Sequence, residues 1–376
     1  MRIGLDATPA VRQGGGIGRY ARELLMALGQ LQRPHNFRLF AASTHPLPYP
    51  LPDLPPNFSF RRLPFHDIWL ARAWHRFNLP LPVELILGPL DLFHALDFAL
   101  PPVQRGLPTL LTVHDLSFVR DPESAAPALR RFLEQVVPRS VRRASHVLAD
   151  SASTRDDILQ LYPVPANKVE VLYPGVDARF RRVNDTAPVR ARYQLGEASF
   201  VLSVSTLQPR KNHVRMVQAF ARLPHPDLRL VIAGGRGWLY EGIFSEVRRL
   251  GLENRVHFLG FVKDSDLPAL YSAARAFAYP SLYEGFGLPI LEAMACGTPV
   301  LTSSVSCLPE IAGGAALLVS PLDVDAIAAG LNRLLTDSRL RSELISSGHA
   351  RAAKFTWDSS ARQLVSIYER LGSGNG

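Results

Sequence analysis

The most informative stretch of this 376-residue sequence runs from Tyr283 to Val300 and reads YEGFGLPILEAMACGTPV. The glycines in Glu284-Gly-Phe-Gly287 predict a flexible turn in which the backbone can approach a ligand closely. Pro289 is expected at the first position of a helix, where its missing N–H is not needed. Glu292 then falls in the first turn of that helix. Because a helix start offers free N–H groups and a positive dipole end, the stretch predicts an anion-binding turn.

The two carboxylates of this stretch have two interpretations. Taken alone, Glu284 and Glu292 could complement the charge of the helix start, with Gly297 as a packing residue. The whole segment, however, resembles the E-x7-E signature of the retaining GT-B glycosyltransferases in glycosyltransferase family 4. The resemblance implies that Glu284 approaches the donor sugar hydroxyls and that Glu292 binds the nucleotide ribose. It also implies that backbone amides serve the sugar and phosphate at Gly285, Phe286, Gly287 and Leu288.

Strand patterns alternate with helix patterns along the chain, which predicts parallel βαβ units and an α/β fold. In the first half, strands are expected at 2–7, 37–42, 92–95, 108–113 and 146–149, with helices at about 17–28 and 125–143. In the second half, strands are expected at 199–204, 227–233, 256–259, 276–279, 299–302 and 315–319, with a helix at 211–223. Residues 46–56 hold six prolines and predict an irregular loop, and 180–197 is a polar segment without a clear pattern.

The family resemblance gives these halves a domain arrangement. It implies the GT-B fold, with two Rossmann-like domains that face a central cleft and a C-terminal helix that crosses back to the N-terminal domain. We expect an acceptor-side domain at 1–188, joined by the helix at about 357–376, and a nucleotide-sugar-binding domain at 189–356. Ligands of open α/β sheets bind outside the carboxyl ends of the strands, so the cleft is the expected site.

A basic loop follows the strand that ends at Val204, and it reads Thr206-Leu-Gln-Pro-Arg-Lys-Asn212. Arg210 and Lys211 are well placed there to neutralise a diphosphate, although a solvated basic turn is the alternative. Many members of the family have an arginine at the position of Thr206 and a lysine at that of Lys211. The resemblance therefore implies a donor site that includes Thr206, with Lys211 in the catalytic role and Arg210 as the neighbouring substitute for the missing arginine.

A histidine ends another predicted strand, in the segment Thr112-Val-His-Asp-Leu-Ser-Phe118. A lone histidine is more often structural than catalytic, and Asp115 could simply cap the following turn. The family places a histidine in this context close to the sugar and the acceptor. The resemblance therefore implies that His114 contacts the transition state or the acceptor, through its backbone carbonyl or its ring.

A glycine cluster, Gly14-Gly-Gly-Ile-Gly-Arg19, follows the first predicted strand. It fails as a dinucleotide fingerprint because Arg19 stands where a glycine or alanine is needed and no acidic residue ends the second strand. In GT-B enzymes this loop faces the donor phosphates, which implies donor contacts from Gly15, Gly16 and Arg19. A hinge or plain loop is the alternative. The resemblance also makes Phe261 and Val262 nucleobase contacts, although Phe261 could be ordinary packing.

Composition limits the class of protein further. The chain has 42 Lys+Arg against 33 Asp+Glu, and the excess is spread over both halves as +5 and +4. This distribution weakens a nucleic-acid interpretation and favours anionic ligands or an anionic membrane face. No apolar stretch approaches the ~20 residues of a membrane span, and the start has no leader pattern. Cys296 and Cys307 fit no zinc or redox spacing. We therefore expect a cytoplasmic protein. Peripheral attachment to the inner face of the membrane is the second location that we consider.

The resemblance implies a retaining, metal-independent hexosyltransferase of polysaccharide or glycoconjugate synthesis. Its partners would be a nucleotide-diphosphate sugar and a glycan or lipid-linked acceptor, with no nucleic acid. No cofactor is expected, and no Asp-x-Asp motif or metal-spaced cluster lies near the loops. The loop sequences at 208–212 and 114–118 resemble those of bacterial mannosyltransferases. This resemblance favours GDP-mannose as the donor over the alternative, a UDP-hexose. A sugar-nucleotide-binding protein without catalysis is a second alternative.

Arginine-rich stretches support a third alternative, a protein that binds anionic surfaces or nucleic acid. The predicted helix at 125–143 carries five arginines, and further ones lie near Trp69 and Trp74 at Arg61, Arg62, Arg72 and Arg76. Solvated basic faces are the commoner explanation of such stretches. We interpret them instead as a surface that helps the first domain reach a lipid-linked acceptor on a membrane.

Overall fold

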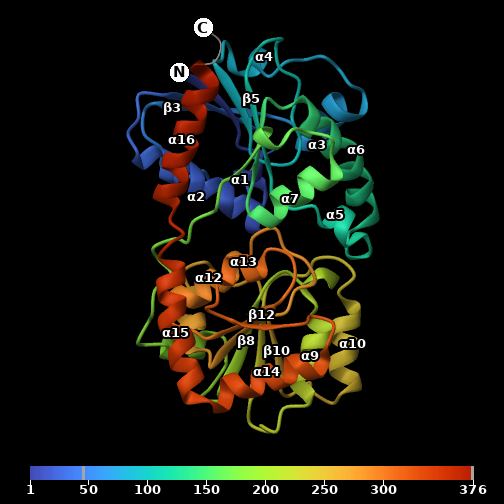
Figure 1. Ribbon diagram of the computed structural model, residues 1–376, viewed down its shortest axis with the longest axis vertical. Helices are drawn as coiled ribbons and strands as arrows, with labels where there is room; N and C mark the ends of the chain where they lie inside the picture. Colours follow the sequence, from blue (N-terminus) through green and yellow to red (C-terminus); the bar gives the residue numbers. More distant parts are fainter. Residues whose placement is uncertain (45–46, 374–376) are drawn as a thin grey trace. The chain divides into compact units, whose positions relative to one another are not determined.

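The computed structural model describes residues 1–44 and 47–373, and the chain divides into two compact units (Figure 1). The first unit contains Met1–Leu116, Arg131–Gly175 and Thr356–Gly376, and the second contains Ser117–Arg130 and Val176–Phe355. Each unit is built on one sheet in which every strand is parallel to its neighbours. This is the α/β architecture that the alternating sequence pattern predicts.

The first sheet has seven strands in the order β3-β2-β1-β4-β5-β6-β7. Their bounds are β1 (Arg2–Asp6), β2 (Asn36–Ala42), β3 (Phe58–Leu63), β4 (Leu92–Ala95), β5 (Thr109–Val113), β6 (His146–Ala149) and β7 (Val169–Val171). The helices of this unit are α1 (Thr8–Arg12), α2 (Gly16–Gln30), α3 (Asp67–Ala71), α4 (Glu84–Leu87), α7 (Ala152–Leu161) and α16 (Trp357–Ser373), with helical turns η1 (Arg72–Arg76) and η3 (Ala166–Lys168). Helix α6 (Pro127–Arg143) crosses the division between the units.

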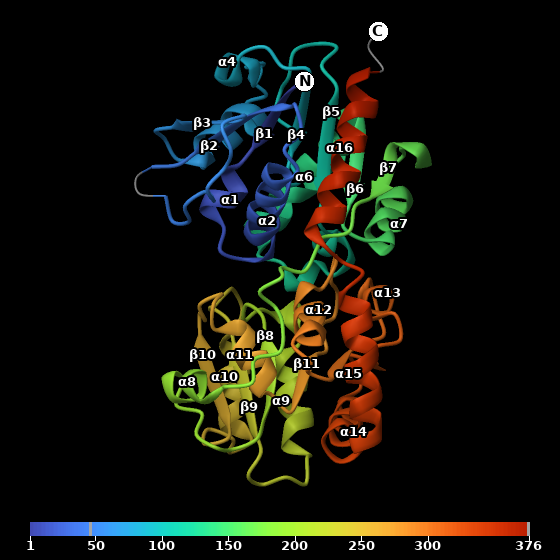
Figure 2. The same ribbon diagram turned by 90° about the vertical axis from the view of Figure 1, so that its left-hand side faces the viewer.

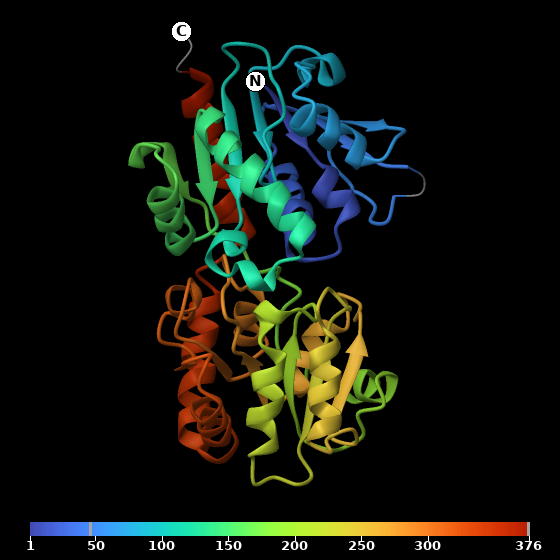
Figure 3. The same cartoon turned by 90° about the vertical axis from the view of Figure 1, so that its right-hand side faces the viewer.

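The C-terminal helix α16 belongs to the core of the first unit, as the family resemblance implies. Leu364 and Tyr368 of α16 pack with Leu24 of α2 and with the strand residues Ile3 and Leu5. The Oη of Tyr368 also lies 2.7 Å from Nδ1 of the buried His94 on β4. Figures 1 and 2 show α16 beside α2, and Figure 3 shows α6 in front of the sheet on the opposite face. Helices on both faces explain why the central strands β4, β5 and β6 are buried along their whole length.

The second sheet has six strands in the order β10-β9-β8-β11-β12-β13. Their bounds are β8 (Phe200–Val204), β9 (Arg229–Ala233), β10 (Val256–Gly260), β11 (Ala276–Tyr279), β12 (Val300–Ser303) and β13 (Leu317–Val319). The helical segments of this unit are α5 (Ser117–Arg120), η2 (Pro122–Ser124), α8 (Ala187–Arg192), η4 (Pro209–Lys211), α9 (His213–Ala221), α10 (Glu241–Arg249), α11 (Leu267–Ala273), α12 (Leu288–Ala295), α13 (Leu308–Ala312), α14 (Val324–Thr336) and α15 (Ser338–Ala352).

Alternate residues of the second sheet enter two different cores, because successive strand side chains point to opposite faces. Val201 and Leu230 pack with α9, α10 and α14, whereas Leu202 and Val231 pack with α11, α12 and α13. The sheet is therefore enclosed between two helical layers.

Several local predictions were wrong. The edge strand β3 was not predicted because its side chains are mostly exposed and include Arg61 and Arg62. The edge strand β7 has only three residues, and α8 lies inside the segment that we interpreted as unpatterned. The helix expected at 211–223 is shorter, since η4 precedes α9. The predicted proline-rich loop is free of helix and strand at 47–56, while Pro46 lies outside the described residues.

Two further features bear on location and chemistry. In the part of the chain that the structure describes, no helix combines the length and the apolar character needed to traverse a bilayer. Cys296 and Cys307 are both buried.

Candidate active site

Two loops that carry predicted site residues lie where the strand order of the second sheet reverses. The strand β8 pairs with both β9 and β11, so the loops that leave β8 and β11 diverge at a topological switch point, where α/β sheets bind ligands. The two loops are fixed to each other: Leu282 N–H donates to the Arg210 carbonyl over 2.8 Å. The Nδ2 of Asn212 donates to the Pro280 carbonyl over 2.9 Å.

A cluster of three predicted catalytic side chains lies between these loops. Lys211 Nζ is 2.6 Å from Glu284 Oε1, and Arg210 Nη1 is 3.1 Å from Glu284 Oε2. Lys211 also donates to Tyr279 Oη over 2.8 Å, and Arg210 to the Tyr283 carbonyl over 2.9 Å. The structure thus brings together residues that lie more than seventy positions apart in the sequence.

The charge of this cluster suits an anionic ligand. Burial of Glu284 raises its pKa, but the positive charges of Lys211 and Arg210 outweigh burial and lower the pKa to about 2. With Glu284 ionised, two cations face one carboxylate and leave a net charge of +1. A buried positive excess at a switch point is suited to bind phosphate.

Three supporting residues were not identified from the sequence. Tyr279 contacts Lys211, and Ser306 Oγ accepts the Glu284 N–H over 3.1 Å. Asn212 adopts a left-handed backbone with φ 59°, and its Nδ2 also donates to the Pro321 carbonyl over 2.7 Å. Asparagine is among the few residues that tolerate this conformation, so its place after Lys211 was the one signal available.

The turn before α12 requires a glycine. Gly287 has φ 95°, and a Cβ there would lie 2.9 Å from Leu308 Cδ2. This left-handed residue lets the helix begin at Leu288, so Pro289 is the second helical residue and not the first. The prediction that Glu292 lies in the first helical turn was therefore wrong.

Glu292 is nevertheless held in a fixed position. It is 2% exposed, and its Oε2 accepts from Tyr271 Oη of α11 over 2.9 Å. The remaining lone pairs of a carboxylate can accept further donors, such as ribose hydroxyls. Tyr271 thus positions the carboxylate that the resemblance assigns to the nucleotide.

The other predicted donor residues of this unit occupy different surroundings. Thr206 follows β8 and is half-buried, while Gly285 and Phe286 are buried in the loop before α12. Phe261 and Val262 follow β10, two strands away from β8, so they are not part of the Lys211 cluster. Phe261 is 64% exposed and can stack on a ligand, whereas the Val262 side chain is in the core and leaves only its backbone.

The glycine cluster of the first unit opens helix α2. Gly15 is the N-cap and Gly16 the first helical residue; both are exposed, and nothing lies near the position of a Cβ. Arg19 N–H donates to the Gly15 carbonyl over 3.0 Å. The loop is tied to the end of β4 because Gln13 Nε2 donates to Asp97 Oδ2 over 2.9 Å. It therefore lies at the switch point of the first sheet, between β1 and β4.

His114 lies at the end of β5 and is 6% exposed. Its Nδ1 is 2.8 Å from Asp150 Oδ2, and its Nε2 is 2.9 Å from the Leu96 carbonyl. Because a carbonyl and a carboxylate are both acceptors, the ring carries both protons. Burial lowers the pKa of His114, but Asp150, Asp97 and the Leu96 carbonyl outweigh burial and raise it to about 9.

This geometry narrows the role of His114. Both ring nitrogens are committed to protein acceptors, which favours a ligand contact through the backbone carbonyl. Asp150 was not among the predicted site residues. The available signal was its place directly after the strand that pairs with β5, since adjacent parallel strands end at the same edge.

Within residues 1–44 and 47–373, no three or more His, Cys, Asp or Glu side chains are grouped in a way that could hold a metal ion.

Comparison with known proteins identifies the family. Residues 14–180 match Glycosyltransferase Family 4, and residues 189–351 match Glycosyl transferases group 1. The chain is 34% identical to O-antigen chain mannosyltransferase B of Escherichia coli, over 99% of this chain and 100% of that protein. It is 30% identical to MMP alpha-(1->4)-mannosyltransferase of Mycolicibacterium hassiacum, over 98% of each chain. Sucrose-phosphate synthase from Thermosynechococcus elongatus superposes with a TM-score of 0.80 at 25% identity, over 100% of both chains. The chain therefore belongs to glycosyltransferase family 4 and has the GT-B fold.

Proposed function

We propose that this glycosyltransferase is a retaining enzyme that moves mannose from GDP-mannose to a hydroxyl of a glycan or lipid-linked acceptor in polysaccharide synthesis. The observation that carries the proposal is the buried Glu284 between Lys211 and Arg210 at the switch point of the second sheet. The two mannosyltransferases that align with nearly the whole chain support the choice of mannose.

The donor diphosphate gains negative charge as it leaves, and preorganised positive groups lower the free energy of that state. In our proposal these groups are Lys211, Arg210 and the N–H groups at the start of α12. A bound diphosphate competes with Glu284 for both cations. The carboxylate oxygens released in this way accept hydrogen bonds from the sugar hydroxyls, and Glu292 accepts them from the ribose.

Retention then proceeds without a covalent intermediate. The acceptor oxygen forms its bond to the anomeric carbon on the face from which the phosphate departs, and the bond from that carbon to the phosphate oxygen breaks. The acceptor proton passes to the leaving phosphate. The His114 carbonyl orients the acceptor sugar or the transferred sugar during this step.

The first prediction concerns metal and stereochemistry. Because two side-chain cations face the diphosphate, we expect transfer in excess EDTA to proceed at the rate seen with Mg²⁺. The anomeric proton of the product, followed by NMR, should keep the configuration of the donor. Activity that disappears in EDTA and returns with Mg²⁺, or an inverted product, would contradict the proposed mechanism.

The second prediction concerns the nucleotide. A ligand at 100 times its dissociation constant stabilises a protein by about 2.7 kcal/mol, so GDP and GDP-mannose should raise Tm clearly more than UDP and UDP-glucose. Glu292→Gln should reduce the shift caused by GDP and leave the Tm without nucleotide nearly unchanged, because the amide oxygen still accepts from Tyr271. The exposed Glu343 provides the matched control, Glu343→Gln. A larger shift with UDP-glucose would replace the donor assignment with a UDP-hexose.

We also propose that the acceptor is reached at an anionic, cytoplasmic membrane face. Trp69 is 59% exposed on α3, and the Arg72 guanidinium lies 5.2 Å from the centre of its ring. Phe77 is 63% exposed directly after η1, next to Arg76. Aromatic and basic side chains together favour the interface of an anionic membrane. Trp74 is buried and takes no part in this surface.

A further inference from the structure

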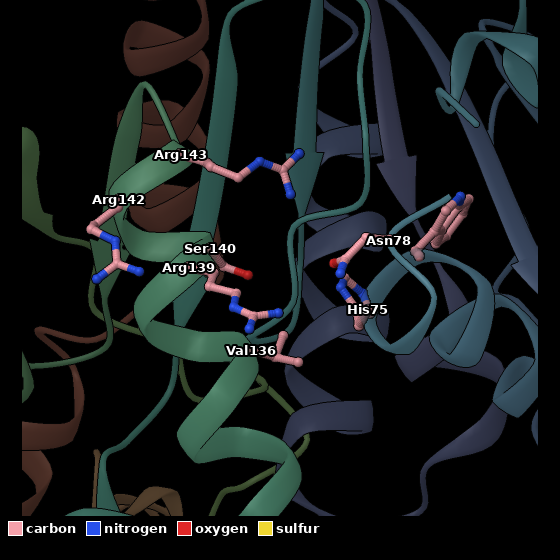
Figure 4. Close-up of a pocket in the computed structure, with 8 residues that line it drawn as sticks. His75, Asn78, Val136, Arg139, Ser140, Arg142 and Arg143 are labelled. Carbon is pink, nitrogen blue, oxygen red and sulfur yellow. The ribbon is translucent and has the colours of Figure 1, made fainter. Parts of the chain in front are cut away.

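A pocket of about 230 Å³ lies in the first unit between η1 and the C-terminal part of α6. Neither the Gly15 loop nor His114 lines it. Figure 4 shows Arg139 and Arg143 extending from α6 toward His75 and Asn78. The residues that line the pocket are Trp74, His75, Asn78, Val136, Arg139, Ser140, Arg142 and Arg143.

The positive charge of this pocket is not balanced by the protein. Over residues 1–44 and 47–373, none of Arg139, Arg142 and Arg143 forms an ion pair with a carboxylate. Arg143 donates only to the carbonyls of Leu100 and Pro101, over 3.3 and 3.0 Å. Burial, together with the charges of Arg143 and Arg139, lowers the pKa of His75 to about 4. The histidine is therefore neutral near pH 7. The guanidinium groups of Arg139 and Arg143 can accordingly bind an anionic ligand.

The uncharged lining also suits a phosphate. The Asn78 amide and the Ser140 hydroxyl can donate hydrogen bonds, while Ser140 Oγ accepts the Leu100 N–H over 2.9 Å. The Trp74 indole donates instead to the Leu81 carbonyl over 2.9 Å, and Trp74 and Val136 are the apolar members of the lining. Planar guanidinium forks with neutral donors are the usual surroundings of a phosphate group.

Exposed apolar side chains belong to residues that neighbour the lining residues His75, Asn78 and Trp74. Phe132 of α6 is 36% exposed, and its ring lies 6.2 Å from that of His75. Leu79 and Leu81, which follow η1, are 42% and 48% exposed. A free inorganic anion gains nothing from these side chains. An amphiphile gains from both parts, because its phosphate meets the arginines and its chain covers the apolar residues.

We propose that this pocket binds the phosphate or diphosphate that links the acceptor sugar to its lipid. The placement favours the acceptor as the source of that phosphate. The segment from Leu96 to Pro101 accepts from His114 at its first residue and from Arg143 at its last, so a short loop joins the pocket to the predicted acceptor contact. This inference rests on the proposed function. It means that the enzyme would hold the acceptor at two places, its sugar and its phosphate.

The test uses farnesyl diphosphate, a soluble prenyl diphosphate, titrated calorimetrically into the full-length protein with the donor site saturated by GDP. We expect farnesyl diphosphate to bind at least about tenfold more tightly than pyrophosphate, because burial of the prenyl chain adds apolar area. Arg139→Glu should lower the affinity for farnesyl diphosphate at least about tenfold. The substitution removes a charge-assisted contact and adds a repulsive charge. Arg139 has no side-chain hydrogen bond to lose within the described residues, so the fold should persist.

Arg131→Glu is the matched control, because Arg131 is exposed on the same helix and does not line the pocket. This control should bind farnesyl diphosphate with the affinity of the wild type. Arg131→Glu and Arg139→Glu should both keep the wild-type affinity for GDP. Lys211→Ala should also retain farnesyl diphosphate binding, which separates failure of this inference from failure of the proposed function.

Three outcomes would overturn the inference. The first is that pyrophosphate and farnesyl diphosphate bind with equal affinity. The second is that Arg131→Glu and Arg139→Glu lower the affinity for farnesyl diphosphate equally. The third is that Arg139→Glu leaves this affinity unchanged. A vesicle experiment tests the source of the phosphate. If phosphatidylglycerol vesicles at the same phosphate concentration displace farnesyl diphosphate, the pocket accepts bulk phospholipid and the assignment to the acceptor is wrong.

Discussion

Replacement of Lys211 by alanine is expected to lower kcat for mannosyl transfer by about 10²–10³-fold, the usual cost of removing one preorganised group that stabilises developing charge. Lys211 Nζ is bonded to Glu284 and Tyr279, so its ammonium is held in place before a donor arrives. The loss should therefore fall on kcat more than on KM. Initial rates with GDP-mannose and a purified acceptor measure both constants.

The same substitution should also lower Tm, because Glu284 then keeps only Arg210 as a buried counter-charge. Adding Glu284→Gln to Lys211→Ala should restore part of the lost Tm without restoring kcat. This double variant separates the electrostatics of folding from those of catalysis. Lys354→Ala removes an exposed lysine of the same unit and should leave both quantities unchanged. Wild-type kcat in Lys211→Ala would remove Lys211 from the mechanism.

Asp150→Asn should produce the largest change in the stability of the first unit. In the folded protein the pKa of His114 is about 9, against 6.5 for an unperturbed histidine. The folded state therefore holds a proton more tightly than the unfolded state, which is worth about 3 kcal/mol at low pH. Asparagine removes the negative charge that raises the pKa of His114 most, so this pKa should fall.

The pH dependence of this effect follows from its sign. The stabilisation is complete below about pH 6.5 and is lost as pH rises through about 9. The difference in unfolding free energy between the wild type and Asp150→Asn should thus be largest at pH 6 and should shrink by pH 10. Urea unfolding at both values measures it, and NMR titration of the His114 ring follows the pKa. Asp156→Asn, at an exposed ion pair of the same unit, is the control. A difference that is equal at pH 6 and pH 10 would exclude a protonated His114 as the cause.

The central strands of both sheets could be predicted because they are buried on both faces and read as short apolar runs. The edge strands β3 and β7 could not, since half-exposed strands with Arg61 or Glu170 lack that signal. Glu284, Lys211 and His114 were found as separate motifs through the family resemblance. Their partners were not predictable, because the approach of Lys211 to Glu284 or of His114 to Asp150 depends on strand order and register. No local pattern in the sequence specifies those contacts.

The position of α16 has a consequence for the synthesis of the protein. The first unit begins at Met1, yet its apolar core is completed by residues of the last helix, including Trp357, Leu364 and Tyr368. Translation proceeds at about 5–20 residues per second, and domains usually fold as they emerge from the ribosome. Here the apolar face of the first sheet that α2 covers in part stays incomplete until α16 has left the ribosome. The first unit is therefore expected to finish folding after the second, and its partly covered sheet is a surface that a chaperone could protect until then.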